Sequence, residues 1–240
     1  CAKFDSDDDP QWEEAGEVDN LHSHGGYVTG SAAASVTSGT SISVDVAVAG
    51  EDRYVLLFVG TRKTSSHRNT NSATFGGSAM SKLRTAGTDG TDDNIVTVFG
   101  IADPAVGTAS AVATFSGDMS GGAASAIVVA LNNVSSAVSG GTSNSDSSAT
   151  TTNTSAITVT IADVGFDMAF LETGTPNVGT GGTSIRTGTT ARVTRNYSPD
   201  TSLTQVQTFS SSSFAHAVQT MRFKGGLMPL DLAVSGPNLV

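Results

Sequence analysis

The chain has few cysteines, few charged residues, few aromatic residues and no long apolar run. It has a single cysteine, Cys1, in 240 residues, which excludes a disulfide within the chain. Charged residues make up only 14% and aromatic residues 6% of the sequence, which leaves few rings for stacking on sugars. No apolar run reaches the roughly 18 residues that a membrane-spanning helix needs. The sequence therefore predicts neither a disulfide framework nor a helical membrane span.

Positive charge is also scarce. Twelve Lys and Arg stand against 22 Asp and Glu, and the formal net charge is −10. Nucleic acid is not expected as a partner, because tracking a phosphate backbone requires clustered Lys and Arg. Much of the acid lies in residues 1–26, which we interpret as a solvated N-terminal arm. A metal or a basic partner surface is the alternative ligand of this arm.

Ser, Thr, Gly and Asn are abundant where the charges are missing, and this composition predicts an all-β fold. Ser, Thr and Asn compete for backbone hydrogen bonds within helices, and Gly costs about 1 kcal/mol at a helical site. Thr and Val suit pleated strands, whereas Gly and Asn suit turns. The apolar fraction of 38% is sufficient for the thin core of a sandwich.

The hydrophobic pattern predicts successive strands. Residues 41–48 alternate strictly, with Ile42, Val44, Val46 and Val48 on one face, as in a half-buried strand. Residues 54–59 form a continuous apolar run typical of a central strand. Further strands are expected within 93–102, at 111–115 and within 123–134. The number and spacing of the strands favour an antiparallel β-sandwich, jelly-roll-like, with extended N- and C-terminal arms.

A low-complexity stretch at 135–153 interrupts this pattern, and it resembles a linker. After it we expect two strands joined by a turn at 162–165, edge or half-exposed strands near 191–198 and 202–209, and a last strand within 213–225. This second set looks too small to close a sandwich alone. We therefore predict one β-sandwich domain at 27–225, an acidic arm at 1–26 and an apolar tail at 226–240.

The tail and one loop are the candidate assembly contacts. A freely exposed tail this apolar would be poorly soluble, so we expect it to dock on its own body or on a neighbouring subunit. The loop after residue 61 is an island of positive charge that is either simply solvated or contacts an acidic surface. The assembly candidates are Leu227, Met228, Leu230, Leu232, Val234, Leu239, Val240, Trp12, Arg62, Lys63 and Arg68.

The order of several motifs resembles a known module. Phe75-Gly76-Gly77, Asp103-Pro104 with Gly107-Thr108, Ala113 to Gly117, and Ala126 to Val134 follow one another along residues 50–135. This order is similar to that of a β-sandwich module of phage virion proteins and bacterial surface proteins. The resemblance implies a fold and a setting, because none of the shared residues is catalytic.

Signatures of catalysis are missing. No G-x-S-x-G elbow, P-loop, dinucleotide-binding fingerprint or Cys-based zinc site occurs. A glycosidase would need two carboxylates across a sugar site. The candidate carboxylates fall mostly at expected turns, where Asp is common for backbone reasons: Asp45, Glu51, Asp103, Asp118, Asp163, Asp167 and Glu172. We therefore expect no enzymatic activity.

Metal binding has only weak candidates. His22 and His24 lie two residues apart and, with Asp19, would suit a transition metal, although a flexible polar segment explains them better. Asp89, Asp92 and Asp93 offer oxygen ligands for a structural calcium but do not follow the EF-hand spacing. No cofactor is expected beyond such an ion.

These observations lead to one functional hypothesis and one alternative. The chain is expected to be a non-enzymatic structural component of a phage virion, in capsid decoration or in a tail or fibre, acting through subunit assembly as a homo-oligomer. The alternative is a secreted or lipid-anchored bacterial surface module that binds a glycan or mediates adhesion. In the alternative, Cys1 would carry the lipid, which is the only membrane attachment that the sequence suggests.

Overall fold

All the regular structure that is described in this chain is β-strand, and the all-β prediction is confirmed. A computed structural model describes residues 3–4, 10–11, 28–63, 68–87, 94–138, 143–146, 155–159, 163–171, 176, 182–196, 203–207 and 214–224. The chain divides into two compact units, Tyr27–Leu227 and a unit made of Cys1–Gly26 with Met228–Val240. In the second unit, β1 (Lys3–Phe4) pairs with β2 (Pro10–Gln11) in an antiparallel ladder.

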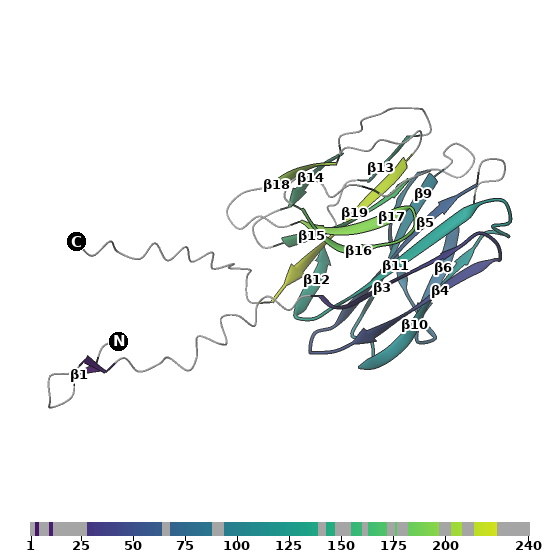
Figure 1. Cartoon of the computed structure of the whole chain (residues 1–240). Helices are drawn as coiled ribbons and strands as arrows, with labels where there is room; N and C mark the ends of the chain where they lie inside the picture. The colour runs from purple at the N-terminus through teal and green to yellow at the C-terminus, as the bar shows by residue number, and fades with distance from the viewer. Residues whose placement is uncertain are drawn as a thin grey trace. The chain divides into compact units, whose positions relative to one another are not determined.

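The first half of the larger unit forms two antiparallel sheets (Figure 1). The four-stranded sheet has the order β4 (Ser41–Val48), β10 (Gly107–Phe115), β6 (Thr70–Phe75) and β7 (Ser78–Ala79). The five-stranded sheet has the order β3 (Val28–Val36), β11 (Ala123–Leu131), β5 (Tyr54–Arg62), β9 (Asn94–Ala102) and β8 (Ser81–Ala86).

The order of these strands is that of a jelly roll. β7 and β8 are two parts of one strand, separated by Met80, that passes from one sheet to the other. We number the strands from β3 to β11 as 1 to 8 in chain order, with β7 and β8 together as strand 5. The order of neighbouring strands is then 2-7-4-5 across the four-stranded sheet and 1-8-3-6-5 across the five-stranded sheet. Two interleaved Greek keys produce this order in jelly-roll domains. The predicted jelly-roll-like sandwich is therefore present.

A third sheet is formed by the second half of the unit. Its order is β12 (Val134–Val138), β19 (Phe214–Phe223), β15 (Asp163–Leu171), β17 (Ala191–Asn196) and β16 (Gly182–Thr187), and β13 (Ser143–Asp146) also pairs with β19. A separate ladder joins β14 (Ser155–Val159) to β18 (Leu203–Gln207).

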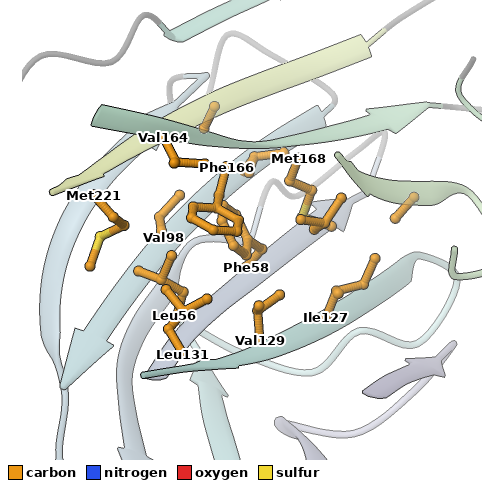
Figure 2. Close-up of a cluster of buried hydrophobic side chains, with 14 of the residues drawn as sticks. Leu56, Phe58, Val98, Ile127, Val129, Leu131, Val164, Phe166, Met168 and Met221 are labelled. Atoms are coloured by element: carbon orange, nitrogen blue, oxygen red, sulfur yellow. The ribbon is translucent and has the colours of Figure 1, made fainter. Parts of the chain in front are cut away.

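The five-stranded sheet is the middle layer of the three, because its strands bury side chains on both faces. On β5, Val55, Leu57 and Val59 contribute to a core shared with the four-stranded sheet. Leu56 and Phe58 point the other way, into a core shared with the third sheet. Figure 2 shows this second core, in which Phe58 and Leu56 lie near Phe166, Val164 and Met221. This explains the continuous apolar run of β5, since a strand with two buried faces cannot alternate.

The strand β4 illustrates the opposite case and confirms its prediction. Its alternate residues Ile42, Val44, Val46 and Val48 are 2–6% exposed, whereas the residues between them are exposed. β4 belongs to an outer layer, so only one of its faces packs against apolar side chains. Each fully buried Val or Ile contributes about 1.5–3 kcal/mol relative to an exposed one.

Residues 135–153, whose composition resembles a linker, contain β13 and most of β12, which both pair with β19. Two local predictions were wrong. The expected turn at 162–165 falls largely in β15, which begins at Asp163 and pairs with β17 and β19, not with β14. β17 is no edge strand either, since it lies between β15 and β16 with its Ala and Val residues completely buried. In each case the strand pairs with another strand that is not its neighbour in the sequence pattern, so the local sequence does not predict the pairing.

Candidate functional site

The predicted cationic loop lies against a neighbouring loop of the same chain. Lys63 follows β5 and Arg68 precedes β6. The Lys63 ammonium donates to the carbonyl oxygen of Asp118 at 2.8 Å, and Arg68 Nε donates to the same oxygen at 3.2 Å. Thr61 Oγ1 also donates to the Arg68 carbonyl at 2.5 Å, which ties the two ends of the loop together. Lys63 and Arg68, two of the three cations that were predicted to be assembly contacts, therefore both donate to the carbonyl oxygen of Asp118.

The side chain of Asp118 organises the loop that receives these cations. Its Oδ1 accepts hydrogen bonds from the Gly39 amide at 2.9 Å, the Ser120 amide at 2.8 Å and the Ser120 hydroxyl at 2.9 Å. The hydrogen bonds from Ser120 and Gly39, with a smaller effect of the Lys63 charge, lower the pKa of Asp118 below its ordinary value of 3.8. Asp118 is thus a backbone-binding carboxylate in a loop, as its predicted turn position suggests.

Glycine allows the two loops to lie this close. A Cβ atom on Gly117 would lie 2.9 Å from Arg68 Nε, and one on Gly122 would lie 2.5 Å from the carbonyl oxygen of Arg62. Both distances are shorter than real Cβ contacts. Arg62, Lys63 and Arg68 are all half-buried as a result. Their proposed role in subunit assembly stays a prediction.

A second polar feature is a buried pair that the sequence reading missed. Asp167 of β15 and His216 of β19 are both 0% exposed, and His216 Nδ1 lies 2.5 Å from Asp167 Oδ1. They occupy the face of the third sheet opposite to Phe166, Met168 and Ala217, which pack towards the middle layer. One signal was available: each is a titratable residue inside an apolar strand, in "GFDMAF" and "FAHAV". Their pairing across two strands was not visible in the sequence.

The third feature is a hollow of about 350 Å³ beside the end of β3. Hydroxyl and small apolar groups line it: Ser35, Val36, Thr37, Ser38, Ala123, Ala124, Thr189 and Thr190. Thr189 Oγ1 donates to Ser35 Oγ at 3.1 Å, and Ser35 Oγ lies 3.3 Å from Ser125 Oγ. The lining has no charged or aromatic side chain, so it can offer only neutral hydrogen bonds and apolar contact.

Some of the other candidate carboxylates, metal ligands and assembly residues lie within the residues that the structure describes, and the rest lie outside them. Asp45 is an exposed residue of β4 and accepts a hydrogen bond from Ser110, and Asp103 forms a turn with a φ of 48°. Within the described ranges, no group of three or more His, Cys, Asp or Glu is placed to hold a metal ion. The remaining metal and assembly candidates lie outside the described residues: His22, His24, Asp89, Asp92, Asp93, Trp12, Leu227, Met228, Leu230, Leu232, Val234, Leu239 and Val240.

Comparison with protein-family models, with curated proteins and with solved structures found no match to this chain. A search of the described residues for a helix long and apolar enough to cross a membrane also found none.

Proposed function

We propose that the chain is a non-enzymatic structural subunit of a phage particle, in capsid decoration or in a tail or fibre. The observation that carries this proposal is the jelly-roll strand order of β3 to β11. Viral capsid proteins use this architecture repeatedly, because a jelly roll confines its edges to the sides of a compact sandwich. The motif order in residues 50–135, which resembles a module of phage virion proteins, agrees with the same setting.

The polar chemistry of the described residues fits a structural role better than a catalytic one. The Asp118 carboxylate and the cations Lys63 and Arg68 are engaged in holding loops together. The Asp167–His216 pair is completely buried. A catalytic acid or base must reach the proton that it transfers in a bound substrate. The buried Asp167–His216 pair is enclosed and so serves the stability of the subunit.

Assembly in this proposal depends on the apolar C-terminal tail. Leu230, Leu232 and Val234 alternate with polar or small residues, so an extended tail would present one apolar face. Adding such a strand to a neighbouring subunit satisfies both its backbone and its side chains. The tail is therefore expected to join one copy to the next.

Sedimentation velocity of the full chain tests this mechanism. A tail variant, Leu230→Asp with Leu232→Asp, should remain folded and should lose the assemblies larger than a dimer. The matched control, Ser235→Asp with Asn238→Asp, adds the same charge at polar positions of the tail and should assemble like the parent. If the tail variant assembles as the parent does, the proposed mechanism is wrong.

The setting has its own test. A structural subunit of a phage should be encoded next to capsid, portal or tail genes, and its peptides should appear in the mass spectra of purified particles. Peptides that appear only in the host envelope or the culture medium would argue against the virion.

One observation favours a second candidate, a surface module that binds a glycan. Lectin domains also use jelly rolls, and the hollow beside β3 is lined with hydroxyl groups. Binding on a glycan array that is lost in Thr189→Val, together with lipid on Cys1 in the intact mass, would support this candidate in place of the virion subunit.

A further inference from the structure

The strand β3 is an edge strand that carries neither a charge nor a proline, and most of its length pairs in regular register. It is the outermost strand of the middle sheet, and β11 is its only partner among the described strands. Its nine residues, Val-Thr-Gly-Ser-Ala-Ala-Ala-Ser-Val, contain no charged residue and no proline, and all are half-buried or exposed. Its single irregularity is a register shift near Thr29, which leaves Gly30–Val36 regular. An edge of this kind is a template for another strand.

The other edge strands of the three stacked sheets are protected. β8 carries Lys82 and Arg84 and a register shift between them. β16 carries Arg186 and a register shift beside it, and β4 carries Asp45 at its centre. β7 has only two residues, and β12 and β13 divide the far edge of the third sheet into two short pieces. Charges, irregular register and short length are the devices by which proteins prevent edge pairing.

The unprotected edge lies on a side of the unit large enough for a stable contact. β3 contacts the edge strand β4 of one outer layer and the edge strand β16 of the other. A nine-residue strand is about 30 Å long, and sheets stack about 10 Å apart, so three such edges present roughly 600–900 Å². A standard protein interface buries about 800 Å² on each partner. The charged residues of these three edge strands are Asp45 and Arg186.

We propose that β3 pairs antiparallel with β3 of a second copy of this chain, so that the two middle sheets join into one. The partner is a second copy because the edge is complementary to itself. A two-fold axis at Ala33 places Ala33 opposite Ala33, Ala32 opposite Ala34, Ser31 opposite Ser35 and Gly30 opposite Val36. Every pair is neutral and small, so no like charges meet, and the backbones can approach to hydrogen-bonding distance.

This pairing supplies one of the subunit contacts that the proposed structural role requires, and in that sense it rests on the proposed function. Sedimentation equilibrium of the full chain should show a dimer, either by itself or as the unit from which the larger assemblies form. Ser31→Lys places a charge on the edge, the device that other edges of the unit use, and should weaken dimerisation at least about tenfold. Ser72→Lys is the control: Ser72 is an exposed serine of β6 in the four-stranded sheet, opposite Thr114 of β10 and away from β3, and its variant should dimerise like the parent.

A cross-link provides a second readout that does not depend on charge. In a Cys1→Ser background, Ala33→Cys should form a disulfide-linked dimer under mild oxidation, because residues opposite each other across an antiparallel pair lie about 5 Å apart. Ser72→Cys in the same background should stay monomeric on a non-reducing gel. A cross-linked Ala33→Cys dimer supports the pairing even if Ser31→Lys fails to fold.

The outcomes separate this inference from the proposed function. A full chain that stays monomeric, or a folded Ser31→Lys variant that dimerises like the parent, overturns the pairing. If dimers appear in the tail variant but not in the parent, the β3 pairing of the parent is also wrong, because the chain's own tail would then cover β3. If the tail variant abolishes large assemblies while Ser31→Lys changes nothing, the proposed function stands and the pairing fails. If the parent forms only β3 dimers, the pairing stands and the tail mechanism fails.

Discussion

His216 Nδ1 lies 2.5 Å from Asp167 Oδ1, and both side chains are completely buried in the third sheet. The two residues come from adjacent strands, since Asp167 is opposite Val218 and His216 is opposite Ala169. Removing one partner of a buried polar pair leaves the other without compensation in a medium of low dielectric constant. The pair therefore makes the stability of the third sheet depend on two residues that are 49 positions apart in the sequence.

Replacing His216 by Ala should destabilise the protein strongly. The Asp167 carboxylate would lose its imidazole partner while it stays buried, and such losses cost about 3–5 kcal/mol. Urea unfolding followed by circular dichroism measures the change. The control is Asp45→Asn, because Asp45 is an exposed β4 carboxylate and its replacement should cost no more than about 0.5 kcal/mol. Equal losses in the two variants would contradict the structural importance of the buried pair.

Asp118 should make the protein more stable at neutral pH than at low pH. Hydrogen bonds from Ser120 and Gly39 lower the pKa of its folded-state carboxyl below 3.8. A carboxyl with a depressed folded pKa stabilises the fold above its unfolded pKa. That contribution is lost as the pH falls from about 3.8 through the folded pKa.

The pKa of Asp118 can be measured by NMR titration of its side-chain carboxyl carbon. The titration should fall below 3.8 in the parent and should move upwards in Ser120→Ala, which removes the hydroxyl donor. Asp118→Asn should remove this part of the acid sensitivity of unfolding. An Asp118 carboxyl that titrates identically with and without the Ser120 hydroxyl would contradict the assignment.

Arg53 should contribute to stability through two turns at once. Its Nε donates to the Pro104 carbonyl at 2.7 Å, and its Nη1 donates to the Gly50 carbonyl at 2.9 Å. Arg53→Met keeps most of the apolar stem and removes both bonds, so a loss of about 1–2 kcal/mol in the free energy of unfolding is expected. Arg186→Met, at an exposed position of β16, should change the stability by less than about 0.5 kcal/mol. Matching effects of the two substitutions on urea unfolding would show that the turns do not depend on Arg53.

The sequence predicted the burial of a strand correctly where the apolar pattern within that strand shows how many of its faces are buried. The alternation of Ile42, Val44, Val46 and Val48 predicted one buried face, and the run after Tyr54 predicted a central strand. Both were confirmed, because side-chain periodicity records how many faces of a strand are covered. The turns at Gly76-Gly77 and Asp103 were equally accessible, since their positive φ angles favour Gly and Asp.

Long-range pairing was not accessible in the same way. β17 contains Arg192, Thr194 and Arg195, a composition that suggested an edge, yet β15 and β16 flank it on both sides. The low-complexity residues of β12 and β13 carry no strong strand signal and are ordered by pairing with β19. The Asp167–His216 pair likewise exists only because β15 and β19 are adjacent. Propensity is a weak guide where a distant partner supplies most of the stabilising contacts.

The contact between Gly60 and Phe170 gives the most direct test of the three-layer arrangement. Gly60 lies on β5 in the middle layer, and a Cβ atom there would lie 2.4 Å from Cγ and Cδ2 of Phe170 on β15. Gly60→Ala should therefore push the third sheet away and cost about 1–3 kcal/mol, as overpacked cores do. Phe170→Leu makes room for the added methyl group. In the double variant the loss should be smaller than the sum of the two single losses by about 0.5–3 kcal/mol, because the residues are in contact. Urea unfolding of the four proteins measures this coupling, and strictly additive losses would mean that the third sheet does not pack on the jelly roll at this point.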